Sequence, residues 1–164
     1  MRVVLIVLLS AAAFGAELTG RIEQTGGIAM RIRDRGQLVT IYVNKDSRVI
    51  GGPLSAGDEI RVDFHQDGKR MIADRIYASI TVSGTVTEMR DDEFWIETSR
   101  PRRETRLIRI RRDTVFGSSR KDLAVDAEVL VVGWDMGDGS IDAARVAIYG
   151  TDTPVQPTGR SRLR

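Results

Sequence analysis

The feature that most constrains the fold of this chain is an internal repeat of about 65 residues. The segment LTGRIEQTGGIAMRIR matches VSGTVTEMRDDEFWIE, which aligns Gly20 with Gly84. Further along, PLSAGDEIRVDF matches DLAVDAEVLVVG, and DGKRMIADRIYA matches DGSIDAARVAIY. A regular period indicates repeated copies of one supersecondary unit. The sequence therefore predicts two copies of one small fold, over residues 17–80 and 81–150.

Each copy has the alternating pattern of β-strands. In the first copy Ile28, Met30 and Ile32 alternate with Arg31 and Arg33, which predicts a strand with one apolar face. The turn signal DRG follows. On the next strand the alternating residues Val39, Ile41 and Val43 are expected to continue the apolar face. The only helix candidates are the short segments PLSAGD and SRKDLAVDAE. Five strands with a connector after the third match a small Greek-key barrel of the OB type.

The two copies also resemble a bacterial exported family, a domain of unknown function with tandem OB-like small barrel repeats. Its units have the form G-x-V, an apolar strand pair, L-x-x-G-D-x-V-x-V and D-G-x-x-x-A-x-x-I. The matching positions are Gly20 and Gly84, Leu54 with Gly57 and Asp58, and Asp67 and Gly68 with Ala73. The second copy departs at Asp126 and Ala127, where the Gly-Asp turn would lie. The resemblance implies OB-type barrels and carries no catalytic residues.

The N-terminal segment MRVVLIVLLSAAAFGAEL has the layout of a secretory signal peptide over residues 1–16. Arg2 precedes an apolar run from Val3 to Leu9, and small residues follow. The run is shorter than the roughly 20 residues that a membrane span needs. We therefore expect a periplasmic or secreted protein without a stable membrane span after cleavage. We expect an all-β fold class, with two tandem five-stranded OB-like Greek-key barrels, and a disordered basic tail over residues 151–164.

The residue types argue against an enzyme. The chain has no cysteine and a single histidine, His65, so thiolate metal sites, a cysteine nucleophile and paired-histidine sites are excluded. It contains none of the common phosphate-loop, serine-elbow or zinc-protease motifs. The segment DMGDGSID places Asp135, Asp138 and Asp142 close together but lacks the spacing and final Glu of an EF-hand. We expect no catalytic residues, no cofactor and no metal.

The segment TSRPRRETRLIRIRRDT, residues 98–114, is the arginine strip, with seven arginines among seventeen residues. Ile108 and Ile110 are expected to be buried while the intervening arginines face outward. On the neighbouring strand Phe94 and Ile96 align with Met30 and Ile32 as core residues, which leaves Trp95 on the outer face beside these arginines. On an OB-type barrel, a cationic face with an aromatic residue suits a single-stranded nucleic acid or an oligosaccharide as ligand. The strip is thus a candidate site for an anionic polymer or glycan, with these ligand-binding residues: Trp95, Arg100, Arg102, Arg103, Arg109 and Arg111.

The alternative is a solvated face whose arginines are neutralised within the chain. Residues 81–150 hold 11 basic and 13 acidic residues, so carboxylates are plentiful around the strip. Glu93 and Glu97 lie on the partner strand and could form cross-strand pairs. In this case the protein is a structural or assembly module of the cell envelope, and its contacts are with other proteins.

A second candidate surface lies in the segment EVLVVGWD. Val129, Val131 and Gly133 match inward positions of the first copy, so Leu130, Val132 and Trp134 are expected on the outer side. A strand that is apolar on both faces is usually covered on both faces. These outer residues are therefore predicted to contact the other barrel or a protein partner in the cell envelope.

Processing of the N-terminus is directly testable. We expect the protein recovered from its native host to begin after Ala13 or near Ala16, because small residues there fit the cleavage subsites. Intact-mass measurement of the soluble protein checks this. Recovery of the full-length chain in the membrane fraction would contradict the exported, soluble form.

Overall fold

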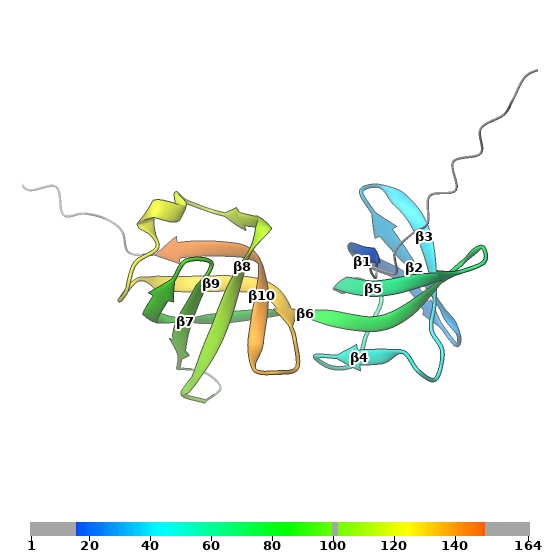
Figure 1. Ribbon diagram of the computed structural model, residues 1–164, viewed down its shortest axis with the longest axis horizontal. Coiled ribbons are helices and arrows are strands. Elements are labelled where there is room, and N and C mark those ends of the chain that lie inside the picture. Colours follow the sequence, from blue (N-terminus) through cyan, green and yellow to red (C-terminus); the bar gives the residue numbers. More distant parts are fainter. Residues whose placement is uncertain (1–15, 100–101, 150–164) are drawn as a thin grey trace, which may run out of the picture. The chain divides into compact units, whose positions relative to one another are not determined.

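The computed structural model describes residues 16–99 and 102–149, and they form an all-β structure (Figure 1). The described chain divides into two compact units between Ser79 and Ile80. The predicted signal peptide and the predicted tail at 151–164 lie outside the described residues, apart from Ala16. No helix of the described part is both long and apolar enough to cross a membrane. The predicted all-β class with a closed sheet is confirmed.

The first unit contains β1 (Ala16–Gly26), β2 (Ala29–Asp34), β3 (Gln37–Tyr42), β4 (Arg48–Ile50), β5 (Glu59–Asp67) and the first part of β6 (Arg70–Arg90). Antiparallel pairings join β3 to β2, β2 to β1, β1 to β5 and β5 to β6. A parallel pairing of β3 with β6 completes the circuit. This is the strand order of a five-stranded OB-type barrel, whose third and fifth strands correspond to β3 and β6 here.

The second unit contains the rest of β6, β7 (Glu93–Thr98), β8 (Glu104–Phe116), the 3₁₀ helix η1 (Arg120–Asp122), β9 (Glu128–Asp135) and β10 (Ser140–Tyr149). Antiparallel pairings join β6 to β7, β7 to β8 and β10 to β9. β8 pairs with β10 in parallel, and β6 pairs with β9. The circuit repeats that of the first unit, and η1 lies in the predicted connector SRKDLAVDAE.

β6 differs from the sequence-based expectation. The two predicted copies meet at residues 80 and 81, so a separate strand was expected on each side of that boundary. Instead β6 is one unbroken strand from Arg70 to Arg90. The intervening residues explain this, because the β-forming segment ITVS contains no glycine or proline that would break a strand.

The predicted alternation describes the two cores well. Met30, Ile32 and Ile41 are buried in the first unit, and Phe94, Ile96 and Ile108 are buried in the second. Ile28 is an exception: it was expected inside with Met30, yet it is 73% exposed. It lies in the turn before β2 begins at Ala29, where the two-residue alternation of a strand no longer applies.

The aligned glycines Gly20 and Gly84 occupy the same structural position. A Cβ on Gly20 would lie 2.5 Å from the carbonyl oxygen of Arg33, and a Cβ on Gly84 would lie 2.5 Å from that of Glu97. In both units the pairing shifts register within the next few residues, between Ile22 and Gln24 or between Val86 and Glu88. The first strand of each unit therefore passes its neighbour at a distance only glycine permits.

The connection that precedes β5 in the first unit is repeated before β9 in the second. Gly57 donates its backbone N–H to the carbonyl of Ile22 at 2.7 Å, and Asp126 donates to that of Val86 at 2.8 Å. Gly57 has φ of 98° and Asp126 has φ of 70°. The second unit therefore forms the same turn as the first, although Asp126 replaces the glycine. Asp tolerates this left-handed conformation better than most residues with a side chain.

In each unit a hydroxyl side chain bonds to the last strand of the circuit: Ser47, directly before β4, bonds to β6, and Thr114 on β8 bonds to β10. The hydroxyl of Ser47 donates to the carbonyl of Ala73 at 2.6 Å, and that of Thr114 donates to the carbonyl of Ala143 at 2.6 Å. Ala73 and Ala143 are the positions that the sequence repeat aligns. The repeat thus extends to individual hydrogen bonds.

We expect Gly20→Ala to lower the free energy of unfolding by about 2 kcal/mol or more, since the added methyl group meets backbone atoms that cannot move aside. Gly26→Ala on the same strand is the matched control, because a Cβ there has no atom within 4 Å. It should change stability by about 1 kcal/mol at most, and in the stabilising direction. Chemical denaturation measures both variants. Equal effects would show that the close approach at Gly20 does not constrain the fold.

Candidate functional site

The arginine strip lies mainly on β8, which forms an antiparallel hairpin with β7. The register places Phe94 opposite Ile108, and both side chains are fully buried. Glu93 lies opposite Arg109 and Trp95 lies opposite Leu107, so these residues share the outer face. The connection between the strands runs over residues 99–103, and Arg100 lies outside the described residues.

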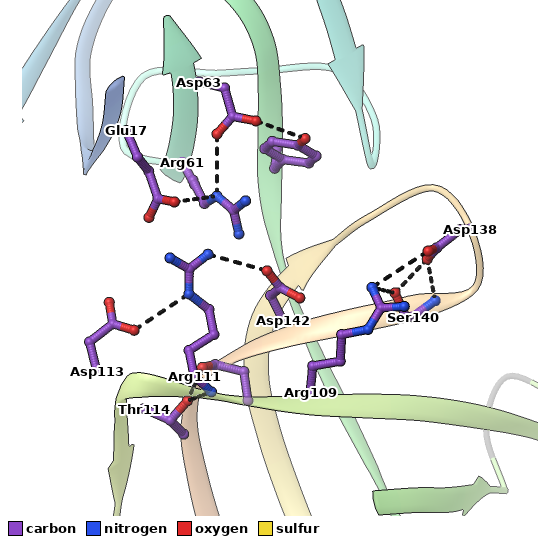
Figure 2. A network of polar contacts seen from close by, with 12 residues as sticks. Glu17, Arg61, Asp63, Arg109, Arg111, Asp113, Thr114, Asp138, Ser140 and Asp142 are labelled. Carbon is purple, nitrogen blue, oxygen red and sulfur yellow. Dashed lines mark hydrogen bonds and ion pairs between the residues drawn. The ribbon is translucent and has the colours of Figure 1, made fainter. Parts of the chain in front are cut away.

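Arg109 and Arg111 project from β8 toward carboxylates (Figure 2). Arg109 lies 3.4 Å from Glu93 and 3.5 Å from Asp138, and it donates to the Ser140 hydroxyl at 2.8 Å. Arg111 lies 3.2 Å from Asp142 and 3.5 Å from Asp113, on the two sides of its guanidinium. Both guanidinium groups are thus neutralised within the second unit.

Two more arginines of the strip are paired near the connection. Arg103 donates through Nε and Nη2 to the two carboxylate oxygens of Glu97, the second at 3.0 Å. Arg106 lies 2.9 Å from Glu104. Among the strip's described arginines, Arg102 and Arg112 are exposed and make no ion pair with a described residue. Four described arginines of the strip are therefore paired with carboxylates.

The sequence indicated some of these partners and missed others. Glu93 and Glu97 were expected on the neighbouring strand. Asp138 and Asp142 were not, because they reach the strip through the parallel pairing of β8 with β10. Asp138 and Asp135 also accept backbone hydrogen bonds from Ser140 and Gly137, so these carboxylates stabilise the β9–β10 turn.

Trp95 is half-buried on the outer face of β7, as the alternation predicted. The cation over its ring, however, comes from outside the strip. The guanidinium carbon of Arg90 lies 4.9 Å from the ring centroid. Arg90 also pairs with Glu88 at 2.8 Å, which holds its side chain in place. In the sequence, Arg90 was marked only by its position directly before Asp91 and Asp92. The structure pairs it with Glu93 across the turn.

Ionisation of the paired groups follows from their contacts. The hydrogen bond and charge of Arg103 lower the pKa of Glu97, and Glu97 raises the pKa of Arg103 in return. Hydrogen bonds from the Ser140 hydroxyl and backbone lower the pKa of Asp138, and the charge of Arg109 acts in the same direction. These carboxylates therefore remain ionised near neutral pH and keep the neighbouring arginines neutralised.

The second predicted surface lies on β9. Val129, Val131 and Gly133 are buried on the inner side. On the other side Leu130 and Val132 are half-buried and Trp134 is 9% exposed. The alternation was thus assigned correctly. The assignment of these three outer residues to an interdomain or partner contact stays a prediction.

Two solved structures are similar to this chain at low sequence identity. A solved structure of drosophila Unr CSD456 is 14% identical, with a TM-score of 0.34, and the match covers 87% of this chain and 65% of that one. A multidomain protein with nucleic acid binding domains from Streptococcus pneumoniae TIGR4 is 16% identical, with a TM-score of 0.26, over 81% of this chain and 44% of that one. The chain therefore spans less than two thirds of the length of either structure. No family model and no curated protein matches the chain.

The pair between Glu97 and Arg103 makes a pH prediction. Because the folded-state pKa of Glu97 is lowered, the pair stabilises the fold above about pH 4.3, the ordinary glutamate pKa, and this contribution is lost as pH falls through the folded-state value. Carboxyl NMR should show that Arg103→Ser raises the pKa of Glu97. Arg102→Ser is the control and should leave it unchanged. An ordinary pKa for Glu97 in the unmodified protein would mean that the pair does not form in solution.

Proposed function

We propose that this protein is a non-enzymatic binding module that acts in the periplasm or outside the cell and contacts an extended anionic polymer or oligosaccharide. The contact surface is the outer face of the β7–β8 hairpin together with its connection. The exported location rests on the N-terminal segment. Cleavage after Gly15 would remove none of the described residues of β1.

The observation that carries this proposal is the stack of Arg90 on Trp95 beside an arginine-rich connection. The pair joins a planar aromatic surface to a cation on one strand face. An aromatic residue offers stacking to a base or sugar ring, and guanidinium groups offer paired hydrogen bonds to phosphate, sulfate or carboxylate. Arg102 and Arg103 extend the cationic surface at the end of the hairpin.

The ion pairs of the strip are compatible with such a ligand. The side chain of Arg103 is 79% exposed and that of Arg109 is 39% exposed. Pairs at exposed positions contribute about 0–1 kcal/mol, so a dense polyanion can compete with them. A guanidinium that donates two hydrogen bonds also keeps further N–H groups for a ligand.

A second candidate function is supported by the same pairs. If the carboxylates hold the arginines permanently, the strip is only a soluble face, and the protein is a structural or assembly module of the cell envelope. Its contacts would then be protein–protein contacts. The apolar side chains of Leu130 and Val132 on β9, which are half-buried, favour this function.

Binding to heparin and polyphosphate across a range of salt concentrations distinguishes the two functions. For the polymer-binding function, affinity should fall steeply with salt, because each neutralised charge on the polymer releases a counterion. The double variant Arg102→Ser/Arg103→Ser should flatten the log–log salt slope by about 1–2. Trp95→Ala should weaken binding by about 1–3 kcal/mol if a ring stacks there.

Arg35→Ser is the matched control. Arg35 is a 95% exposed arginine in the first unit, so its removal lowers the net charge by one, half the change in the double variant, without touching the hairpin. It should leave the salt slope nearly unchanged. Absence of binding even at low salt, or equal losses for Arg35→Ser and the hairpin variants, would favour the structural function instead.

A further inference from the structure

A polar groove opens at one end of the second unit, next to the connection between β7 and β8. It has a volume of about 550 Å³ and receives residues from β6, β7, β9 and β10. The residues relevant to recognition are Ser83, Thr85, Glu97, Arg103, Glu128 and Tyr149. They combine hydroxyl groups, an ion pair, a free carboxylate and an aromatic ring. Convergent polar groups beside an aromatic surface can fix the orientation of a small ligand.

The aromatic member, Tyr149, is 52% exposed at the end of β10. The antiparallel register places it opposite Glu128, the first residue of β9. The face of an aromatic ring carries partial negative charge and packs against positively polarised hydrogens. The C–H groups on one face of a sugar ring provide such hydrogens, while the hydroxyl groups around its edge remain free for polar contacts.

The ion pair between Glu97 and Arg103 supplies polar contacts without net charge. Arg103 uses two of its five N–H donors on Glu97, and each carboxylate oxygen accepts one of these bonds. Three donors and several lone pairs remain. Neighbouring hydroxyl groups of a sugar both donate and accept hydrogen bonds, so this ion pair complements them.

The walls of the groove are held in place before a ligand arrives. Gly84 packs against the backbone of Glu97, and Thr98 beside it is 2% exposed and donates to the carbonyl of Arg102 at 3.0 Å. In contrast, the hydroxyls of Ser83 and Thr85 make no hydrogen bond to any described residue. A prearranged site loses little conformational entropy on binding.

The charge of the groove selects the ligand class. Glu97 and Arg103 cancel, and Glu128 makes no ion pair with a described residue, so the described residues of the lining carry a net charge of −1. The groove itself therefore offers no net positive charge to an anionic chain. We propose that the groove binds a segment of a neutral oligosaccharide, with one sugar ring on Tyr149 and its hydroxyls on Glu128 and the Glu97–Arg103 pair. This site is separate from the Trp95 face and does not depend on the proposed polyanion binding.

The test uses saturation-transfer NMR and titration with three neutral hexasaccharides: cellohexaose, maltohexaose and chitohexaose. At least one should bind with a Kd of about 1 mM or tighter. Its affinity should be nearly independent of salt, because no counterions are released. Tyr149→Ala should weaken binding by about tenfold, and Tyr149→Phe should retain most of it. Glu128→Gln should also weaken binding, since a carboxylate is a stronger acceptor than an amide.

Two controls separate this site from the polyanion surface. Trp95→Ala should leave hexasaccharide binding intact, and Tyr149→Ala should leave heparin binding intact. Arg103 stays unchanged throughout because it contributes to both surfaces. Melting temperatures confirm that each variant is folded. Failure of all three hexasaccharides to bind, or equal binding by the unmodified protein and Tyr149→Ala, would overturn the proposal, whatever the result with heparin.

Discussion

The close approach of two backbones at Gly20 and Gly84 is the constraint on which both circuits of strands depend. At each position a Cβ would lie 2.5 Å from a carbonyl oxygen of the neighbouring strand. A register shift follows within a few residues, and such bulges bend a strand and increase its twist. A bent first strand can pair along both edges. β1 pairs with β2 and β5, and β6 pairs with β7 and β9. Closure removes the free edges that would otherwise invite aggregation.

Charge on the β7–β8 hairpin is organised by the closed sheet. The parallel neighbour β10 brings Asp138 and Asp142 to the arginines of β8, and β7 brings Glu93 and Glu97. A surface that looks strongly basic along the sequence is therefore a mixed surface in space. For the proposed function, an anionic ligand competes with these carboxylates, so binding is expected to depend on polymer charge density and on salt.

The two proposed binding surfaces, the outer face of the hairpin and the groove, adjoin at Arg103. On the outer face, Arg90 and Trp95 combine a cation with an aromatic ring, which suits an anionic chain. In the groove beside the connection, Arg103 is neutralised by Glu97, and Tyr149 with Glu128 suits a neutral sugar. An oligosaccharide with both charged and neutral residues would satisfy both surfaces, whereas a uniform polyanion would satisfy only the first.

Local sequence patterns determined the strands of this protein, the face of each strand that is buried and the equivalent positions of the two units. Alternation identified the buried residues Met30, Ile32, Phe94 and Ile96 and placed Trp95 outside, because neighbouring residues of a strand face opposite sides whatever the partner strand is. The internal repeat identified Gly20 and Gly84 as equivalent and aligned Asp126 with Gly57, but the left-handed conformation of Asp126 came from the structure, because the missing glycine had put the turn there in doubt. These features depend on backbone geometry within a few residues.

Only the tertiary structure decided which charges meet. Asp138 and Asp142 reach the strip because β10 runs parallel to β8, a pairing between segments about 30 residues apart that no local pattern encodes. Arg90 covers Trp95 because of the β6–β7 register, and Tyr149 joins Glu97 in one groove because closure brings the end of β10 to the end of β7. The sequence determined the strands and their faces, since these are local properties. The neighbours of each side chain followed from how the sheet closes.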